Sequence, residues 1–529
     1  MSRRRFIQGS AAALSVAAAG TSLSAVHVPR TLGLRRFGPS HPFDYARLKG
    51  LARALAAERY RPPPEKLPPA LARLTWDRWE AIRYREHRAL WADEPSRYRI
   101  AFMHLGYTVV APVLMYEVAG GRARQIEYDP AMWDYRRAGI RADELPANLG
   151  FGGFKVFYHT DWTRDCTVYQ GASYFRAVDG QMQYGMSQRG LAIDTGMPRP
   201  EEFPDFVAFY LERPDAGSNR LTVFALLDSP SVAGAYRFRI DAGAMQVMNV
   251  DAALYPRRRI ERIGIAPGTS MFYKGKNQQG VSEDWRPEIH DSDGLQILNG
   301  QGEWLWRPLV NPRTVRVNTF LDDNPRGFGL MQRERHFSAY EDDGVFYERR
   351  PDCWVEPKTG WGRGTVMLVE IPTPNETNDN IVAFWNPEDK PEAGQELTFA
   401  YALNWCRDNP LSCPLATTGA TFTGIGGVIG RKRTYFSWRF VVDFFGGNLE
   451  MLTDADRVVP VISASRGRIE LASARPLRPL HGWRAMFDLV PDASTEPIDL
   501  RLYLMLDGQP LTETWLYLYE PPPLGERQF

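Results

Sequence analysis

The clearest pattern along the chain is a short-range alternation of apolar and polar positions, repeated in many segments from about residue 97 onward. Tyr236 to Ile240 and Thr314 to Phe320 alternate strictly, which is typical of strands with one buried face. Leu221 to Leu227 is continuously apolar, which predicts a strand buried on both faces. Glycine and proline recur between these segments, so the pattern predicts a large all-β region with many strands.

Helical spacing is concentrated near the start of the chain. Leu48, Leu51 and Leu55 lie on one face of a predicted helix that ends before Pro62. Thr75 is the expected N-cap of a second, short helix over residues 76–84. These helices precede the strands and leave the all-β prediction unchanged.

A polar, proline-bearing stretch at residues 388–396 predicts a linker between two domains. A length of 529 residues also exceeds what one core normally supports. Residues 29–387 are predicted to form the N-terminal domain, a large β-sandwich. Alternating segments at 435–445, 483–489 and 500–506 predict a smaller, immunoglobulin-like sandwich over residues 397–529.

Residues 1–28 have the features of a twin-arginine export signal. Arg3 and Arg4 are followed by Phe6, then by an alanine-rich run and by small residues suited to signal peptidase. The apolar run is too short and too poor in large side chains to span a bilayer stably. We therefore expect this segment to be removed after export, which places the mature protein in the periplasm.

The charge balance excludes several kinds of partner. The chain has 64 basic and 63 acidic residues, and residues 1–28 contain arginines but no acid, so the remainder is close to neutral. We expect no nucleic-acid partner and, in the absence of a long apolar run, no stable membrane insertion. The 15 Trp, 23 Tyr and 27 Phe suit either a large β core or stacking on sugar rings.

The sequence lacks the common signatures of metal, nucleotide and serine-hydrolase sites. It contains no H-E-x-x-H, no Walker A loop and no G-x-S-x-G, so we expect no metal and no cofactor. The cysteines are Cys166, Cys353, Cys406 and Cys413, and none forms a C-x-x-C pair. Cys406 and Cys413 suit a disulfide in an oxidising compartment, but two separate thiols fit the spacing equally well.

Two acidic segments offer candidate chemistry. Asp291 lies in the segment His-Asp-Ser-Asp, and Asp379 lies in Asn-Asp-Asn, directly before the apolar run 381–385. Glycoside hydrolysis needs two such carboxylates, one to protonate the leaving oxygen and one to act opposite it. Aspartate and asparagine are also common in solvated turns, which is the simpler interpretation from residue types alone.

Longer sequence motifs favour the catalytic interpretation of these aspartates over solvated turns. From about residue 43 to 520 the chain resembles the osmoregulated periplasmic glucan biosynthesis proteins, a family with a G and a D branch. The twin-arginine leader indicates the D branch. The motifs that carry the resemblance are Gly171–Val178, Tyr184–Gly185, Arg189–Asp194, Glu202–Phe206, Gly264–Pro267, Thr269–Phe272, Ile289–Asp293, Asn324–Gly329, Trp354–Pro357, Asn378–Val382 and Glu513–Trp515.

The resemblance implies a fold and an activity. The large domain would be a sandwich of the galactose-mutarotase type, joined to the immunoglobulin-like domain, with a cleft that binds β-1,2-glucan. The family resembles anomer-inverting glycosidases, with Asp379 as the general acid and Asp291 as the base. Tyr347, Ser292 and His290 would help to orient a proton relay.

Further residues are assigned supporting roles. Glu376 is a candidate like-charged neighbour that raises the pKa of Asp379 and is grouped with the residues expected to bind substrate, although a turn or surface acid is the simpler interpretation. The residues expected to contact sugar are Trp354, Trp385, Tyr107 and Tyr174 as stacking platforms, with core packing as the alternative for each, and Arg350 and Lys358 as donors, with a solvated face as the alternative.

The reaction itself stays open between alternatives. Endo-hydrolysis of β-1,2-glucan is the first expectation. The loop from Gly424 to Trp438 is shorter than the D branch suggests, and in the family this loop closes over the cleft. An inverting transglycosylase or cyclase that forms an α linkage is therefore the second, and a non-catalytic glucan-binding protein that assists a membrane synthase is the third. A homodimer is left open.

Overall fold

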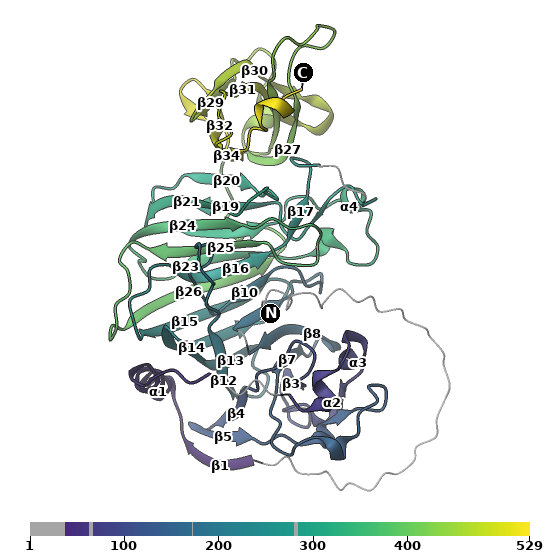
Figure 1. Cartoon of the computed structure of the whole chain (residues 1–529), viewed down its shortest axis with the longest axis vertical. Helices are drawn as coiled ribbons and strands as arrows, with labels where there is room; N and C mark the ends of the chain where they lie inside the picture. Colours follow the sequence, from purple (N-terminus) through teal and green to yellow (C-terminus); the bar gives the residue numbers. More distant parts are fainter. Residues whose placement is uncertain (1–36, 63–66, 172, 280–283, 529) are drawn as a thin grey trace.

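The structure is a computed structural model that describes residues 37–528 except 63–66, 172 and 280–283. The predicted export signal lies outside these residues. Strands dominate the described chain, which confirms the all-β prediction. Figure 1 shows large stacked sheets in the purple-to-green part of the chain, with the yellow-green C-terminal strands at one end of the long axis.

The larger sheet contains 16 strands within the described residues and runs through most of the molecule. Its order is β1 (Phe37–Pro42), β5 (Arg122–Ile126), β4 (Leu114–Ala119), β12 (Asp205–Glu212), β13 (Arg220–Asp228), β14 (Val232–Asp241), β15 (Gln246–Pro256), β26 (Leu397–Cys406), β23 (Asp352–Pro357), β22 (Gly327–Met331), β19 (Gly294–Leu298), β20 (Trp304–Pro308), β34 (Thr514–Tyr519), β32 (Ile498–Leu506) and β29 (Val459–Ala464), with β33 (Gln509–Pro510) beside β32.

A second sheet of ten strands faces the first, again counting described residues. Its order is β21 (Arg316–Asp323), β24 (Arg363–Glu370), β25 (Ile381–Pro387), β16 (Ile263–Ser270), β10 (Ser187–Arg189), β9 (Tyr174–Ala177), β8 (Asp161–Gln170), β7 (Gly153–Tyr158) and β3 (Tyr98–Met103), with β11 (Leu191–Ile193) beside β16. Two short ribbons join β17 (Phe272–Lys274) to β18 (Ile289–His290) and β2 (Arg83–Tyr84) to β6 (Trp133–Asp134).

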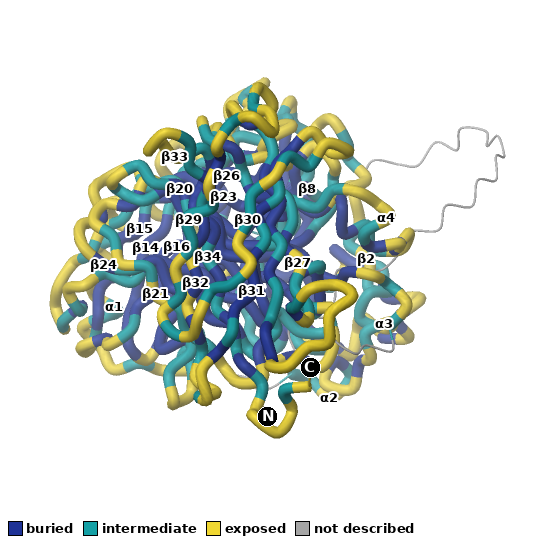
Figure 2. Tube along the Cα trace, turned by 90° about the horizontal axis from the view of Figure 1, so that it is seen from above, coloured by how far each residue is buried: buried dark blue, intermediate teal, exposed yellow. Residues whose placement is uncertain are grey.

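The main core lies between these two sheets. Alternate residues of β13, β14 and β26 pack against residues of β7, β16 and β24 in one continuous apolar cluster. Figure 2 shows buried strand segments running through the interior and exposed loops around the outside. The helix α1 (Tyr45–Ala57) covers the outer face of the larger sheet, where Leu48 and Ala52 pack against β13 to β15.

The early helices are as predicted, with shorter bounds. Asp44 caps α1 by accepting the N–H of Arg47 at 2.7 Å, and Leu51 of the predicted apolar face is exposed. Thr75 caps α3 (Trp76–Glu80) through the N–H of Arg78 at 3.4 Å. The remaining helices are α2 (Pro69–Ala72) and α4 (Phe337–Tyr340). No helix in the described part of the chain is both long and apolar enough to span a bilayer.

The C-terminal strands form a smaller two-layered sandwich. A four-stranded sheet of β27 (Thr417–Ile425), β28 (Trp438–Phe445), β31 (Gly482–Val490) and β30 (Arg468–Leu477) packs against β32 and β34. Phe440, Phe487, Leu502 and Trp515 are fully buried between the layers. The predicted strands at 483–489 and 500–506 are therefore present as β31 and β32.

The predicted linker at 388–396 does not divide the two sandwiches. The strand that follows it, β26, pairs with β15 on one side and β23 on the other, deep within the larger sheet. Residues 397–406 thus belong with the large sandwich, and the C-terminal strands begin at Thr417. A proline-bearing turn and a domain boundary have the same local composition, so the pattern alone placed the division too early.

The two sandwiches are continuous. Strand β20 pairs with β34 in parallel, matching Leu305 with Thr514 and Trp306 with Trp515, so that one sheet extends through both. Cys166, Cys353, Cys406 and Cys413 are all free thiols, which resolves the open question of a Cys406–Cys413 disulfide.

Candidate functional site

Asp379 lies in the loop between β24 and β25, and Asn380 holds it there. The buried Asn380 side chain donates to the carbonyls of Phe272 (3.0 Å) and Ile371 (2.9 Å) and accepts the N–H of Phe272 (2.8 Å). Its backbone N–H donates to the carbonyl of Ser270 at 3.1 Å. These bonds tie the end of the loop to the neighbouring strand β16, which fixes the backbone beside Asp379.

The surroundings of Asp379 favour its protonated form. Burial raises the pKa of Asp379 to about 7, and the negative charge of Asp291 adds to the rise, while Arg176, Arg189 and Arg350 oppose it. Its Oδ2 is fully shielded and has no hydrogen-bond partner within the described residues. The residue as a whole is half-buried, so the carboxyl is shielded but the loop still meets solvent.

Asp291 lies directly after β18 in a different electrostatic setting. It is 4% exposed, its N–H donates to the carbonyl of Met271 at 2.8 Å, and its Oδ1 is ion-paired with Arg350. The Arg350 guanidinium stacks on the ring of Tyr347, 4.2 Å from the centroid. The ion pair stabilises the negative charge of Asp291, whereas burial disfavours the charged form of Asp379.

Arg189 completes one wall of the site. Its guanidinium lies between the rings of Tyr174 and Phe203, at 5.1 and 5.3 Å from their centroids, and is ion-paired with Glu201 at 2.6 Å. Burial raises the pKa of Tyr174 to about 12, and the charge of Asp379 contributes to that rise. Tyr174 therefore lies near Asp379, with its ring in contact with an arginine that the prediction did not single out.

The arginines around Asp379 could have been recognised in the sequence as candidate site residues. Arg176 and Arg189 lie in motifs that support the family resemblance. Arg176 interrupts the otherwise apolar strand β9, and Arg189 ends the fully buried strand β10. A charged residue in a buried strand needs a partner, which marks it as a candidate for a site. Their position beside Asp379 depends on the pairing of β9, β10 and β16, which local sequence does not reveal.

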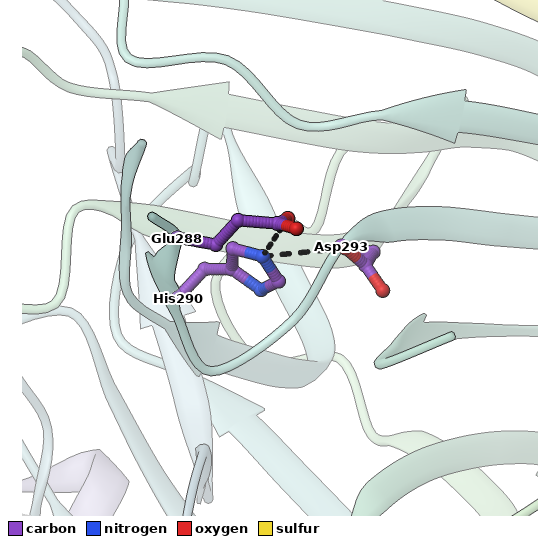
Figure 3. Close-up of side chains that lie close together, drawn as sticks. All are labelled: Glu288, His290 and Asp293. Carbon is purple, nitrogen blue, oxygen red and sulfur yellow. Dashed lines mark hydrogen bonds and ion pairs between the residues drawn. The ribbon is translucent and has the colours of Figure 1, made fainter. Parts of the chain in front are cut away.

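Ser292 and His290 flank Asp291. The hydroxyls of Ser292 and Ser270 are hydrogen-bonded at 2.8 Å. His290 Nε2 lies 3.1 Å from Glu288 and 3.4 Å from Asp293 (Figure 3), and its Nδ1 lies 2.8 Å from Gln332 Oε1. Burial opposes a charged ring, but the carboxylates of Asp293 and Glu288 outweigh it and raise the pKa of His290.

The cluster of Glu288, His290 and Asp293 could be taken for a metal site, because their ligand atoms lie within 4.8 Å of one another. The Lys276 ammonium, however, lies 3.8 Å from Glu288 Oε1, and a second cation there would be repelled. Gln332 Oε1 also requires a hydrogen on Nδ1, while Nε2 faces two carboxylates. The neighbouring Lys276 ammonium therefore favours an ion-paired histidine over a bound metal at this cluster.

Glu376 does not act on Asp379 as expected. Its carboxylate is occupied by the Arg286 guanidinium, with both oxygens at 2.8 Å. The like-charged neighbour that raises the pKa of Asp379 is Asp291 instead. Spacing of three residues along a loop does not bring two side chains together as it would on a helix, and the partly exposed, ion-paired Glu376 is nearer to the alternative of a surface acid.

The two tryptophans expected as stacking platforms are core residues. Trp354 and Trp385 are fully buried. Trp354 stacks on Trp304, with centroids 5.8 Å apart, and Trp385 packs beside Trp361 at 6.2 Å. Their strands, β23 and β25, turn these side chains inward, so they offer no face to a ligand.

None of the interactions described for Tyr107 and Lys358 involves Asp379 or Asp291. The Tyr107 ring packs edge-on against Trp76 at 5.7 Å. The Lys358 ammonium pairs with Glu356 at 2.7 Å, and its N–H donates to the carbonyl of Ala400. Of the residues proposed to contact sugar, the structure places Arg350 and Tyr174 at the site.

The loop between β27 and β28 is exposed over most of its length. Ile429 is 97% exposed, and Val428 and Tyr435 are also exposed. Asp488 of the neighbouring strand β31 holds the base of the loop through the N–H of Gly427 at 2.7 Å. The side chain of Thr423, at the end of β27, donates to the carbonyl of Asn277 at 2.9 Å, which brings the hairpin to the large sandwich.

Fold and site together define a class of protein. It is a large all-β protein with two shielded aspartates and several arginines around them. Comparison with known proteins identifies the family. Residues 43–519 match the family described as periplasmic glucan biosynthesis protein, MdoG. The chain therefore belongs to the MdoG family of periplasmic glucan biosynthesis proteins.

The relatives match along the entire chain. Glucans biosynthesis protein D of Stenotrophomonas maltophilia (strain K279a) is 56% identical over 529 residues, covering 99% of each chain. Glucans biosynthesis protein D of Xanthomonas campestris pv. campestris (strain B100) is 54% identical over 531 residues, covering 100% of both. The protein of the same name from Xanthomonas oryzae pv. oryzae (strain PXO99A) is also 54% identical. The family resemblance seen in the sequence is thereby confirmed.

Proposed function

We propose that this protein is an anomer-inverting glycosidase that cuts β-1,2-glucan in the periplasm. Family membership supports a role in periplasmic glucan biosynthesis, and the relatives named for that process cover the chain from end to end. The choice of a β-1,2 linkage and of hydrolysis goes further than these names. It rests on the resemblance described above and on the chemistry of the two aspartates.

One observation carries the proposal: Asp379 and Asp291 have opposite surroundings. Burial raises the pKa of Asp379 to about 7, so it can hold a proton at neutral pH, whereas Asp291 is ion-paired with Arg350. Glycosidases depend on such a contrast between an acid that is kept neutral and a carboxylate that is kept charged.

The reaction follows from these states. Asp379 would donate its proton to the glycosidic oxygen as the bond to the anomeric carbon breaks. Asp291 would remove a proton from a water that attacks the same carbon from the opposite face, so the configuration inverts. Tyr347 stacks against Arg350, the partner of Asp291, and Ser292 follows Asp291 directly in the chain, so both would help to orient the groups around the attacking water. The reducing end released would have the α configuration.

The test is incubation with linear β-1,2-glucan, followed by mass spectrometry and NMR of the products. Shorter linear chains, each with one oxygen from labelled water and an initial α reducing end, are expected. A protein that binds the glucan but leaves its length unchanged would contradict the proposal. That result would favour the third alternative, a glucan-binding protein that assists a membrane synthase.

A second candidate is transfer of the glucan chain to a sugar hydroxyl instead of water. The short β27–β28 loop favours it, because Val428 and Ile429 at its tip are exposed to solvent instead of being buried against the large sandwich. If the shorter loop covers less of the expected cleft, a sugar hydroxyl would have room to act as the acceptor. The same acid and base would then form an α linkage, and an acceptor within the same chain would give a ring. Cyclic products without a reducing end, or a new α signal, would identify this outcome.

A further inference from the structure

Arg286 is the centre of an ion-pair cluster beside the site. It precedes β18 by three positions, and its side chain is 11% exposed. The guanidinium donates to three carboxylates from three separate segments: Asp284 at 2.9 and 2.6 Å, Asp342 at 2.9 Å, and both oxygens of Glu376 at 2.8 Å. The planar fork of arginine can serve three partners at once, which a lysine ammonium cannot match in geometry.

One of these partners belongs to the loop that carries Asp379. The ends of that loop are fixed, because Asn311 bonds both backbone groups of Thr373 (3.0 and 2.9 Å) and Asn380 is tied to β16 and β17. Between those anchors, Glu376 makes the side-chain hydrogen bonds that tie the described loop to another segment. The path of the loop up to Asp379 therefore depends on this contact as well as on the bonds of Asn380.

A second partner belongs to the segment that carries Arg350. Asp342 receives the Arg286 bond on Oδ2, and its Oδ1 accepts two backbone N–H groups of the turn that follows, at 2.9 and 3.0 Å. That turn leads into η5 (Tyr347–Arg349) and then to Arg350, whose guanidinium is ion-paired with Asp291. A chain of directional bonds therefore runs from Arg286 to Asp291 as well.

We propose that Arg286 is a positioning residue that sets the distance between Asp379 and Asp291 by clamping together the two segments that hold them. The inference rests on the proposed function. In an inverting glycosidase the separation of the two carboxyl groups defines the space for the attacking water. A displacement of about 1 Å at such a site can reduce the rate by about 100-fold.

The test compares Arg286→Lys and Arg286→Gln with wild-type protein on linear β-1,2-glucan. We expect kcat to fall by about 10–100-fold in both variants, the range typical of residues that orient catalytic groups, with KM nearly unchanged. Arg286→Gln should also lower the melting temperature, because it leaves three carboxylates without their cation, so Arg286→Lys, which keeps the charge, is the variant that tests positioning. Glu376→Gln and Asp342→Asn should lower kcat in the same direction, because each removes one arm of the clamp. Wild-type kcat in Arg286→Lys, or a loss that appears entirely in KM, would overturn the inference.

A double-mutant cycle separates positioning from a general effect on folding. If Arg286 acts through Asp379, then adding Arg286→Lys to Asp379→Asn should cost less than about 3-fold, because residues that act as a unit are non-additive. A full additional loss in that background would overturn the inference. The matched control is Arg220→Lys, which alters an exposed bidentate pair with Asp241 (3.0 and 3.1 Å) and should leave kcat unchanged.

These outcomes distinguish the two hypotheses. A wild-type protein that leaves the glucan unchanged rejects the proposed function. A wild-type protein that cuts the glucan, together with an equally active Arg286→Lys variant, rejects only the clamp.

Discussion

Asp379 and Asp291 are the same side chain in opposite surroundings, and this contrast yields the most direct predictions. Burial raises the pKa of Asp379 to about 7, whereas Asp291 faces the Arg350 guanidinium. Identical substitutions at the two positions should therefore have different effects on stability. They should have similar effects on activity if both residues take part in the reaction.

Asp379→Asn should lower kcat by about 10²–10⁴-fold, the contribution of a general acid, while glucan binding is retained. The wild-type rate should fall as the pH rises above about 7, because the acid then loses its proton. A raised pKa in the folded state stabilises the protein fully below the unfolded value, and this stabilisation is lost as the pH rises toward 7. The melting temperature of Asp379→Asn, relative to wild type, should therefore increase from pH 4 to pH 8. A difference that is constant with pH would contradict the assignment.

Asp291→Asn should destabilise the protein at neutral pH, unlike the change at Asp379. It leaves the Arg350 guanidinium buried without a counter-charge, and breaking a buried pair costs about 3–5 kcal/mol. The double variant Asp291→Asn with Arg350→Met should recover part of the loss, since no uncompensated charge remains. Urea denaturation measures both effects, and equal stability of Asp291→Asn and wild type would show that the ion pair is weak.

Strand β26 belongs to the large sandwich, although its position after the predicted linker indicated the C-terminal domain. Its residues pair with β15 and β23, and Leu403 is fully buried between them and the opposing sheet. The strand is therefore part of the large core, although it follows the proline-bearing turn that was predicted to be a linker.

Leu403→Ala should destabilise the protein by about 2–5 kcal/mol, because it leaves a cavity in the large core. The matched control is Leu321→Ala on the edge strand β21, where the side chain is 87% exposed and the change should stay within about 0.5 kcal/mol. Chemical denaturation of both variants gives the comparison. A small effect at Leu403 would mean that β26 contributes little to the large sandwich.

Across the entire chain, the large and small sandwiches are joined by shared structure. One sheet continues from β20 into β34, and Trp304 and Trp306 of the first part pack in the same apolar cluster as Trp515. Arg333, next to β22, is ion-paired with the buried Glu513 beside β34, with Nη2 at 3.0 Å from Oε2. Few contacts of this kind would exist across a flexible linker.

We expect the protein to unfold in one calorimetric transition, because neither sandwich can lose its structure without exposing apolar surface of the other. Glu513→Gln should lower the transition temperature by weakening the link with Arg333, without splitting the transition. Two resolved transitions in the wild-type protein would show that the sandwiches are thermodynamically independent.

Export is the remaining prediction at this level, and it concerns residues outside the described structure. Changing Arg3 and Arg4 to lysine together should leave the protein in the cytoplasm, because twin-arginine signals depend on both arginines. Fractionation of cells that express the variant and the wild-type protein gives the result. A periplasmic double variant would show that the leader uses another route.

Local patterns in the sequence were enough to predict the all-β class, the short N-terminal helices with the Thr75 cap, and strands such as β13, β14 and β32. Each of these features depends on interactions between residues close in sequence, or on which face of a strand is apolar. Both produce a regular spacing of apolar residues that can be read from the sequence. The family motifs also pointed to the segments that hold Asp291 and Asp379, and the site they form still awaits the experiments above.

Only the tertiary structure decided the neighbours of those residues. Glu376 lies close to Asp379 in sequence yet pairs with Arg286, while Asp291, 88 positions earlier in the chain, supplies the neighbouring charge. Trp354 and Trp385 could have faced a ligand or the core, and the pairing of β23 and β25 placed them inside. Composition records that a residue is polar or aromatic, but its partner depends on which distant strands pair, and that is determined by how the whole chain packs its apolar surface.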